Sequence, residues 1–394
     1  MAAGPRPAHG AEPAAERPGA AGAGRGPLVS VSSVPRLEGA PAGGTAVRGI
    51  VEVEAAVVEG RAAVSAHLER FHDLHAHPAT PPTAGVAWLR RVLPSAPPAS
   101  VWAVHVDGGP GERAALVLVD RVDDGGRRTE LLAGGGGHQA SLAATTPAAA
   151  ARLGQVLGEA AHRRGSALHL AELPDDPRVH ALAAGAGAEL LDALPVPEVR
   201  RPAEGEHLVS SGVRKNLRKT HNRLAHDGIG AEMSFSTDPA AFEAALPELE
   251  AAYRDRDEAH GVPCALDTPA GRDTWLARLR ALGDLGRREL AVLRLDRELA
   301  AYVVGVPGGE RYGIFDGRFV TRWARFSPGR LLEHEVLQRA FADPGVEVVD
   351  WMTGVAPETL LAVSGTRRRL VVRRGRPGVP VPRSAGGGGA APLD

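Results

Sequence analysis

The sequence predicts a mixed α/β protein built from two similar units that follow one another along the chain. Apolar residues alternate in some stretches, as in half-buried strands, and recur every three or four residues in others, as in amphipathic helices. These stretches give the order β-α-α-β-β-β-α-β-α-β twice within 394 residues. The two stretches have no obvious sequence similarity, so only their pattern repeats. Because errors of interpretation would have to coincide in both, the repeat favours two α/β domains side by side.

Low-complexity segments frame the two units. Residues 1–46 and 377–394 consist mainly of Ala, Gly and Pro with scattered charges. Such segments cannot bury much apolar surface, so we expect disordered tails. Between them lie a first unit over residues 47–200 and a second unit over residues 201–376, a length that suits two domains.

The first unit begins and ends with strand candidates. Val64, Leu68 and Phe71 follow one another at helical spacing, which predicts a helix over residues 61–75. Thr146 is a suitable N-cap for a long helix that ends at residue 163, with a proline at its first helical position. The expected strands are residues 51–58, 101–106, 114–122, 128–133, 140–144, 167–171 and 189–194, and the other helices are residues 86–93 and 177–184.

The second unit repeats this order after a basic helix over residues 212–227. Asp238 can cap a helix over residues 239–258, in which Phe242 and Leu246 share one face. Three consecutive strands can form a meander with short turns, and strand-helix-strand steps place helices on the faces of the sheet. The expected strands are residues 229–236, 289–295, 299–306, 311–316, 347–352 and 369–372, and the other helices are residues 271–285, 357–363 and one that starts at Ser327.

Composition excludes several classes of protein. The formal net charge is -1, so a globally basic nucleic-acid binder is not expected, and DNA is not an expected partner. Cys264 is the single cysteine, which excludes an internal disulfide and fits a reducing cytoplasm, the expected location. No stretch is long and apolar enough to span a membrane, and the N-terminus lacks the apolar core of a secretory signal. The 15 histidines show no spacing typical of a zinc site, so we expect no metal.

A strand-to-helix junction at residues 326–332 is the most distinctive candidate site. Ser327 can cap the helix with its hydroxyl, Pro328 needs no hydrogen bond at the first helical position, and Gly329 allows a ligand to approach the backbone. A helix start with free N–H groups suits an anion. Arginines follow or precede it at positions 322, 325 and 330. The alternative interpretation is a capped surface helix with solvated arginines.

Aromatic residues are distributed unevenly between the two units. All three tyrosines and six of the seven phenylalanines lie in the second unit, whereas the first is rich in Ala and Gly. Aromatic side chains build shaped, partly polar walls. We therefore expect the working site in the second unit and a degenerate, supporting role for the first. Compositional drift in a GC-rich gene is the alternative explanation.

The basic helix is a second candidate for binding anions. Arg214, Lys215, Arg218 and Lys219 fall on one face, beside an apolar stripe. A solvated face is the commonest explanation for such a run. The alternatives are contacts with phosphates of a donor, with the acceptor end of a tRNA, or with a polyanionic substrate. A second arginine cluster lies at positions 367, 368, 369, 373 and 374.

Four stretches of the second unit resemble a known family. They read Val-Arg-Lys-Asn-Leu-Arg-Lys from residue 213, Leu-Ala-Val-Leu-Arg-Leu-Asp from residue 290, Phe-Ser-Pro-Gly from residue 326 and Val-Asp-Trp-Met-Thr-Gly from residue 349. Together with the repeated order of elements, they resemble the GNAT acyltransferases, and among these the tandem-GNAT, FemAB-like proteins of the acetyltransferase 6 type. The likeness covers residues 212–363, whereas the first unit matches by pattern only.

The resemblance implies two tandem GNAT-like domains and an N-acyltransferase. Such an enzyme moves an acyl group, in the first place acetyl, from acyl-CoA to an amine. In this fold the loop and helix start after the fourth strand hold the pyrophosphate of coenzyme A. The matching residues here are Arg325, Phe326, Ser327, Gly329, Arg330 and Leu331.

Two alternatives to this function stay open. Some FemAB-like relatives take their acyl group from aminoacyl-tRNA and act on a cell-wall precursor, but these carry a coiled-coil arm, and no sustained heptad run occurs here. The other alternative is a tandem-GNAT scaffold without catalytic activity. The expected partners are therefore a small-molecule or cell-envelope-precursor amine, with tRNA as the less favoured one.

Acyl transfer to an amine needs a neutral amine, a polarised carbonyl and a path for the proton. Asp316, at the end of a strand, can accept a proton, or it is a turn residue before a glycine. Asp350, near the end of the next strand, can orient a substrate, or it is a strand-end carboxylate with its own partners. Tyr312 can act as an acid or line the pocket, or it packs in the core. These three residues are the catalytic candidates.

Overall fold

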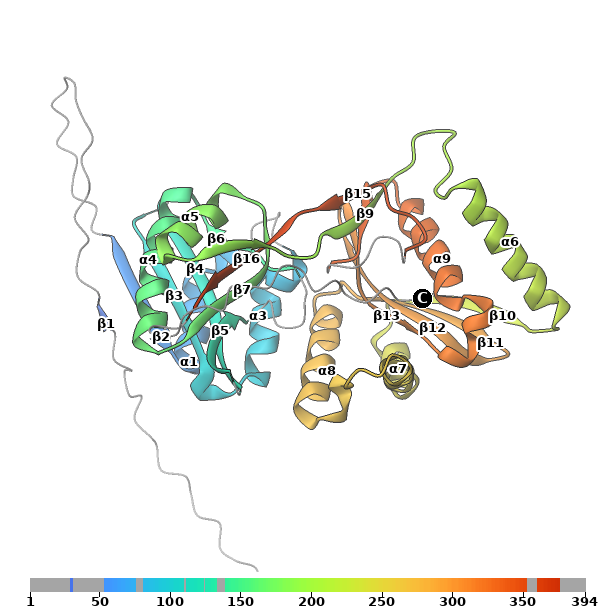
Figure 1. Ribbon diagram of the computed structural model, residues 1–394, viewed down its shortest axis with the longest axis horizontal. Helices are drawn as coiled ribbons and strands as arrows, with labels where there is room; N and C mark the ends of the chain where they lie inside the picture. Colours follow the sequence, from blue (N-terminus) through green and yellow to red (C-terminus); the bar gives the residue numbers. More distant parts are fainter. Residues whose placement is uncertain are drawn as a thin grey trace, which may run out of the picture.

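The computed structural model describes residues 29–30, 53–75, 81–109, 111–123, 125–132, 139–352 and 360–375. Two mixed sheets with helices on their faces lie side by side (Figure 1). This architecture confirms the predicted mixed α/β class and the tandem arrangement. The predicted tails at residues 1–46 and 377–394 lie outside the described residues, apart from β1 (Val29–Ser30), which pairs with β2 (Glu54–Glu59).

The first sheet has the strand order β1-β2-β3-β4-β5-β7-β16-β8, with β6 beside β4. Its two faces are covered by different helices: Trp102 packs with α4 and α5, and Val101 packs with α1 and α3. Thr146 accepts a hydrogen bond from Ala149 N and caps α4 as predicted. The helix predicted over residues 61–75 is divided at Phe71. The strands are β3 (Val101–Asp107), β4 (Arg113–Asp123), β5 (Gly126–Leu131), β6 (Ala143–Ala144), β7 (Ala167–Pro174), β8 (Glu189–Asp192) and β16 (Arg369–Arg374), and the helices are α1 (Arg61–Arg70), α2 (His72–His75), α3 (Val86–Val92), α4 (Pro147–Arg163) and α5 (Pro177–Ala186).

The second sheet has the strand order β10-β11-β12-β13-β14-β9-β15. Leu293 and its neighbours on one face pack under α9, and Val292 and its neighbours on the other face pack on α7 and α8. The basic helix α6 lies beside α9 at the outer end of the molecule (Figure 1). The strands are β9 (Val196–Arg200), β10 (Ala231–Ser236), β11 (Glu289–Leu295), β12 (Glu298–Gly308), β13 (Arg311–Phe319), β14 (Val348–Asp350) and β15 (Gly365–Arg367), and the helices are α6 (Ser211–His226), α7 (Pro239–Ala259), α8 (Pro269–Asp284) and α9 (Pro328–Ala342). Part of the helix predicted over residues 357–363 lies outside the described residues.

The two halves exchange strands. β9 follows β8 in the chain but lies between β14 and β15 in the second sheet, and β16 lies between β7 and β8 in the first sheet. Figure 1 shows β16, in red, among the green strands of the first half. The expectation that residues 369–372 close the second unit is therefore wrong, because local pattern does not reveal which sheet a strand joins. The division at residue 200 stays a prediction for the units as a whole.

A single hydrophobic core joins the two halves. It contains α3 and β4 residues of the first half together with α7, α8 and β13 residues of the second. At its centre, the ring of Trp88 meets the ring of Phe315 edge-on, with 5.8 Å between their centroids. Trp88 is 1% exposed. Since large aromatic side chains contribute strongly to core packing, the halves stabilise each other across this contact.

Glycines let α4 and α5 approach each other closely. A Cβ atom at Gly185 would lie 2.0 Å from the carbonyl oxygen of Ala151, and one at Gly154 would lie 2.2 Å from the carbonyl oxygen of Leu182. Both obstacles are backbone atoms, so a side chain there requires the helices to move apart. These glycines are needed for packing.

The variant Gly185→Ala is expected to lower the free energy of unfolding by about 1–3 kcal/mol, because the added methyl group forces α4 away from α5. Urea unfolding followed by circular dichroism measures this change. Gly212→Ala is the matched control, since its Cβ would meet only Ser210 Oγ, at 3.9 Å. The control is expected to be neutral or slightly stabilising. Equal stabilities of the two variants would contradict the packing argument.

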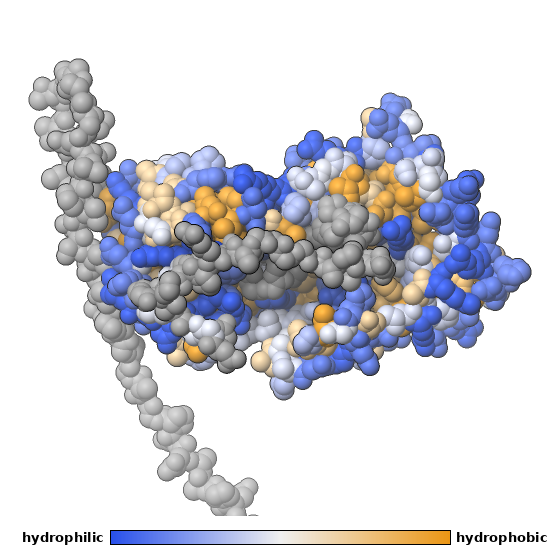
Figure 2. Space-filling view, viewed as in Figure 1, coloured by the Kyte–Doolittle hydropathy of each residue, from blue (hydrophilic) through white to orange (hydrophobic). Residues whose placement is uncertain are grey.

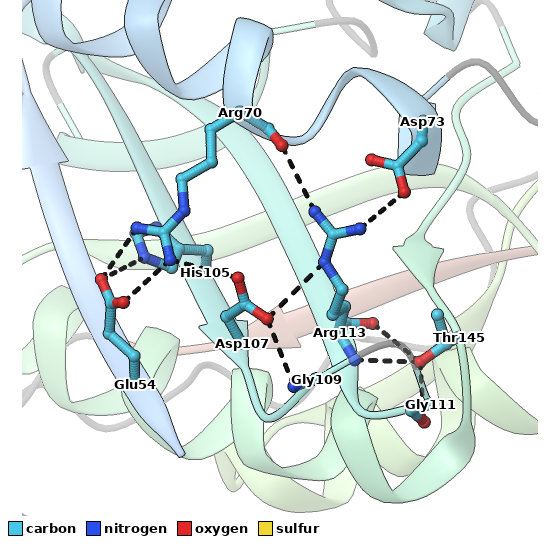
Figure 3. Close-up of polar contacts among 9 residues, drawn as sticks. All are labelled: Glu54, Arg70, Asp73, His105, Asp107, Gly109, Gly111, Arg113 and Thr145. Carbon is cyan, nitrogen blue, oxygen red and sulfur yellow. Dashed lines mark hydrogen bonds and ion pairs between the residues drawn. The ribbon is translucent and has the colours of Figure 1, made fainter. Parts of the chain in front are cut away.

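A surface ion network in the first half lies beside the buried His105 (Figure 3). Arg70 Nη2 pairs with Glu54 at 2.8 Å and with Asp107 at 3.1 Å, and the Arg70 hydrogen bond lowers the pKa of Glu54 to about 2. His105 Nε2 lies 3.4 Å from Glu54 Oε1. The centroid of the His67 ring lies 5.3 Å from that of the His105 ring. Neither ring nitrogen of His67 has a hydrogen-bond partner, and burial lowers its pKa to about 3.

His67 is expected to make the protein sensitive to acid. The unfolded chain binds a proton at this residue below about pH 6.5, whereas the folded chain stays neutral there until about pH 3. Stability therefore falls as pH falls through this window, by up to about 1.4 kcal/mol per pH unit. His67→Leu should reduce this slope by about one proton in unfolding titrations between pH 7 and pH 4. The exposed His162→Leu is the control, and equal slopes for both variants would disprove the assignment.

Candidate functional site

A pocket of about 320 Å³ lies where α6 meets the start of α9. Both helices line it, so parts of the two anion-binding regions predicted separately from the sequence meet in one pocket. Figure 2 shows hydrophilic residues over the end of the molecule that α6 forms. The lining residues are Val213, Asn216, Leu217, Lys219, Thr220 and Arg223 from α6, Ser327, Arg330 and Leu331 from the α9 start, and Leu361.

The α9 start differs from the expected cap. Ser327 adopts a left-handed conformation with φ 46°, and its hydroxyl makes no capping hydrogen bond. Its carbonyl oxygen accepts from the amides of Arg330 and Leu331, at 3.1 and 3.2 Å, as the carbonyl before a helix ordinarily does. The predicted role of the Ser327 hydroxyl as a cap is wrong, because a capping side chain reaches the helix amides from an extended backbone and that of Ser327 is left-handed. Since Ser327 lines the pocket, its hydroxyl is available to a ligand.

Positive charge dominates the pocket. Lys219, Arg223 and Arg330 line it, and within the described residues neither Lys219 nor Arg330 has a carboxylate at ion-pair distance. Arg223 is held in place because its Nη1 donates to the carbonyl oxygen of Arg325. Charge-assisted hydrogen bonds to phosphate or carboxylate oxygens are the strongest that such groups form. The pocket is therefore suited to an anion.

Three other residues predicted to bind the donor, Arg325, Phe326 and Gly329, are not among the lining residues of the pocket. The side chain of Arg325 points to Asp227, with Nη2 3.1 Å from a carboxylate oxygen. Phe326 is fully buried in the core of the second half, so its side chain serves packing, and its assignment to the donor site stays a prediction. Gly329 lies next to the lining residues, and a Cβ there would be in ordinary contact with Phe319. Glycine is thus not required by packing at this position.

On α6, the structure separates the predicted basic residues. Lys219 lines the pocket, whereas Arg214, Lys215 and Arg218 are not among the lining residues. Lys215 and Arg218 are exposed, and Arg214 is half-buried with its Nη1 unpaired. The sequence analysis missed Asn216, Thr220, Arg223 and Leu361. Asn216 and Arg223 lie three and four residues from Lys219, so helical spacing from Lys219 would have found these two, whereas Thr220 follows Lys219 directly.

β14 pairs with only the first part of β13. β14 pairs only with Arg311, Tyr312 and Gly313 of β13, and beyond that point β13 pairs with β12 alone among the described strands. A bulge at Phe315 shifts the register, because Val304 faces Asp316 while the next residue faces Ile314. Backbone groups along such an edge can bind an extended ligand that carries amides. A 3-10 helix (Thr321–Phe326) links this edge to the start of α9.

Asp316 is surrounded by donors. Trp275 Nε1 and Tyr302 OH donate to one of its carboxylate oxygens at 3.0 and 3.1 Å, and Arg318 Nη1 donates to the other at 2.8 Å. The amide of Gly317 donates as well. Four donors therefore fix the orientation of this carboxylate. Its predicted role as a base stays a prediction, and the geometry favours a positioning role.

Asp350 is likewise fully engaged. Its Oδ1 accepts from Gln139 Nε2 at 2.9 Å and from the amide of Met352 at 2.8 Å, while Arg367 donates to Oδ2 at 2.9 Å. Arg311 lies 3.4 Å from the same oxygen. Gln139 belongs to the first half, so Asp350 fixes the backbone where β14 leaves β13 and ties it to that half.

Tyr312 lies on the α9 side of the sheet and is not among the lining residues of the pocket. Its hydroxyl donates to Glu289 Oε2 at 2.9 Å, and it occupies the space that a side chain at Gly305 would need. Burial raises its pKa well above the usual value for tyrosine. Since Tyr312 is 3% exposed, the packing alternative describes its surroundings better than the role of an acid.

Glu333 is a site residue that the sequence analysis did not find. It lies on α9, one turn after Arg330, and its Oε1 accepts from the amide of Leu361 at 2.8 Å. Leu361 lines the pocket. Burial raises the pKa of Glu333 to about 7. A carboxyl group that titrates near neutral pH therefore lies at the rim of the cationic pocket.

The comparison with known families identifies this region. Residues 211–358 match the family model of the acetyltransferase (GNAT) domain. This part of the chain is a GNAT-type acetyltransferase domain. It contains α6, the start of α9 and β13, so every lining residue of the pocket except Leu361 lies inside the matched region. No curated protein matches the chain.

Solved structures share the fold. A conserved protein of unknown function from Bacteroides thetaiotaomicron VPI-5482 has a TM-score of 0.52 and 10% identity, covering 78% of this chain and 97% of that one. FemX has a TM-score of 0.49 and 12% identity, with coverage of 74% and 87%. A tandem GNAT protein from the clavulanic acid biosynthesis pathway has a TM-score of 0.43 and 17% identity, with coverage of 82% and 98%. The first of these similarities extends over most of both halves, so the tandem arrangement belongs to the shared fold.

Two further findings concern the described part of the chain. No three His, Cys, Asp or Glu side chains within it gather in a way that could hold a metal ion. None of its helices is long and apolar enough to cross a bilayer.

Glu333 is expected to make anion binding depend on pH. Dephospho-CoA is a suitable probe, because the charge of its pyrophosphate diester is constant between pH 6 and pH 8. Its affinity should fall on the order of two- to fivefold from pH 6 to pH 8, since Glu333 gains a negative charge beside Arg330 in this range. Calorimetric titrations measure the effect, and Glu333→Gln should abolish most of it. A variant with an unchanged pH dependence would exclude Glu333 as the cause.

Proposed function

We propose that the protein is an N-acyltransferase that moves an acyl group, in the first place acetyl, from acyl-CoA to an amine. The observation that carries the proposal is the pocket at the start of α9, where Lys219, Arg223 and Arg330 converge without carboxylate partners at Lys219 and Arg330. The pocket lies in the GNAT-type domain. Its charge fits the phosphates of coenzyme A.

The sheet beside the end of β14 is the proposed place for the rest of the donor, because β14 pairs with β13 only as far as Gly313. The pantetheine arm of coenzyme A carries two amides, which can form hydrogen bonds with backbone groups at the edge of a strand. The thioester would then lie in the gap where β13 and β14 diverge. Asp350 fixes this gap by holding the amide of Met352, at 2.8 Å. Acyl transfer depends on such positioning, because correctly held reactants react far faster than free ones.

The acceptor is an amine of a small molecule or a cell-envelope precursor in this proposal. The amine attacks the thioester carbonyl, a C–N bond forms, the C–S bond breaks, and the thiol of coenzyme A leaves with the proton that the amine gives up. Asp316 and Asp350 would act as positioning residues. The first half would supply the facing wall through Gln139 and Trp88. Acyl-CoA is a cytoplasmic metabolite, so the proposal includes a cytoplasmic location.

A second candidate is an aminoacyl-tRNA-dependent transferase. One observation favours it: within the described residues, Lys215 and Arg218 on the exposed face of α6 have no ion-pair partner. Phosphates of a tRNA acceptor end could bind there. A non-catalytic scaffold would bind neither donor. Titration of the protein with acetyl-CoA and, separately, with aminoacylated tRNA distinguishes the three cases.

The donor proposal predicts that Lys219→Ala and Arg330→Ala each weaken acetyl-CoA binding about five- to tenfold, because each variant removes one charge-assisted contact to phosphate. Calorimetry measures the affinity, and release of free thiol in the presence of amines measures transfer. Lys215→Ala is the matched control on the same helix and should change the affinity less than about twofold. Equal effects of Lys215→Ala and Lys219→Ala would refute the pocket as the donor site, and absence of acetyl-CoA binding would refute the proposed function.

A further inference from the structure

Arg369 on β16 is buried without a partner. It is 2% exposed, and its Nε and Nη2 atoms make no hydrogen bond. Buried guanidinium groups in folded proteins are ordinarily paired with carboxylates or carbonyl groups. Burial lowers the pKa of Arg369 to about 10, so it remains charged at neutral pH. A buried cation with two free donor positions is a site that another molecule can complete.

Glu172 on β7 supplies the opposite charge nearby. Its Oε2 is buried and has no hydrogen-bond partner, and burial raises its pKa. Glu172 and Arg369 each favour the charged form of the other, yet no ion pair joins them. Asp350 also favours the charged form of Arg369, whereas Arg367 and Arg311 oppose it. A group with a negative and a positive end can therefore satisfy both Arg369 and Glu172.

The backbone conformation at Glu172 departs from that of a regular strand. The register between β7 and β16 shifts at this point, and Glu172 has a positive φ of 61°. A bulge with such a residue turns a side chain out of the regular alternation. The carbonyl oxygen of Glu172 accepts from the amide of Ala140, and the amide of Gln139 donates to the carbonyl oxygen of Met352, both at 3.0 Å. Met352 also has a positive φ, of 54°.

This pair lies on the side of the second sheet that faces away from the donor pocket. Val349 packs under α9, so its neighbour Asp350 points to the opposite face. Asp350 contacts Gln139 of the first half and acts electrostatically on Arg369. β13 and β14 pair only as far as Gly313 and Asp350, so among the described residues no pairing of these two strands divides the two faces beyond that point. A donor on the α9 side and an acceptor on the Arg369 side can thus meet at the gap.

Resting on the proposed function, we propose that Arg369 and Glu172 bind an acceptor that carries a carboxylate beside its amine. The carboxylate takes the free donors of Arg369, and the ammonium group takes the free oxygen of Glu172. The acceptor class is therefore an amino acid, either free or as part of a peptide. Arg311 and Arg367 cannot replace Arg369, because Glu198 and Asp350 already hold them.

The test is binding of amino acids to the full chain, measured independently of acyl transfer. Saturation-transfer NMR with the twenty L-amino acids and with a set of dipeptides identifies a ligand, and calorimetry gives its affinity. The two sets distinguish a free amino acid from a peptide. The corresponding amine without a carboxylate is expected to bind about tenfold more weakly or worse.

Arg369→Gln and Glu172→Gln should each weaken binding of that ligand about tenfold or more and leave acetyl-CoA affinity unchanged. Arg368→Gln is the control, since Arg368 is exposed and already paired with Asp175 and Asp192. Thermal unfolding checks the fold of each variant. If Arg369→Gln does not fold, Glu172→Gln decides, because its side chain is only partly buried.

Three outcomes would overturn the proposal. The first is that the wild-type protein binds acetyl-CoA but none of the amino-acid or dipeptide probes at about 10 mM. This concentration is roughly tenfold above the usual upper limit of KM values, so the result would mean that the site holds only water. Another is unchanged amino-acid affinity in Arg369→Gln and Glu172→Gln. The third is equal affinity for the amino acid and its amine. Absence of acetyl-CoA binding would instead refute the donor assignment and leave the amino-acid titration interpretable.

Discussion

The exchange of β9 and β16 is the constraint on which the rest of the structure depends. Separating the halves would break the pairing of β16 with β7 and β8 and that of β9 with β14 and β15. It would also expose the shared core around Trp88 and Phe315. The two units therefore cannot move apart as beads on a linker would. A gap between β13 and β14 that is bordered by both halves keeps a fixed shape for this reason.

The charges at the strand crossing maintain that shape. Glu198 and Asp350 are 4% and 3% exposed, and both pair with Arg311 and Arg367. Burying carboxylates is unfavourable unless cations and hydrogen bonds compensate, so such a cluster adds little net stability. Its effect here is geometric, because Asp350 holds the amide of Met352 at the point of divergence. Arg369, next to this cluster, lacks such compensation, which sets it apart from its neighbours.

The sequence predicted those features that depend on neighbouring residues. Helical spacing and capping residues predicted α4 and α7, and Pro328 marked the start of α9. The strand exchange was not predictable, because β16 has the same local pattern in either sheet. The partners of Asp316 and Asp350 come from Trp275, 41 residues away, and Gln139, 211 residues away. The site as a whole requires α6 to lie against α9, a tertiary contact that no local pattern contains.

Composition gives an independent argument for the donor pocket. The chain contains 46 basic residues, of which only Lys215 and Lys219 are lysines, and both lie on α6. In so arginine-rich a chain, drift would place arginine at these positions too. A lysine ammonium is a compact charge on a flexible stem, whereas a guanidinium is a broad planar fork. Lys219 lines the pocket with Arg223 and Arg330 and is exposed, so its flexible stem can adapt to a bound phosphate. Lysine at this position therefore supports the proposed donor pocket.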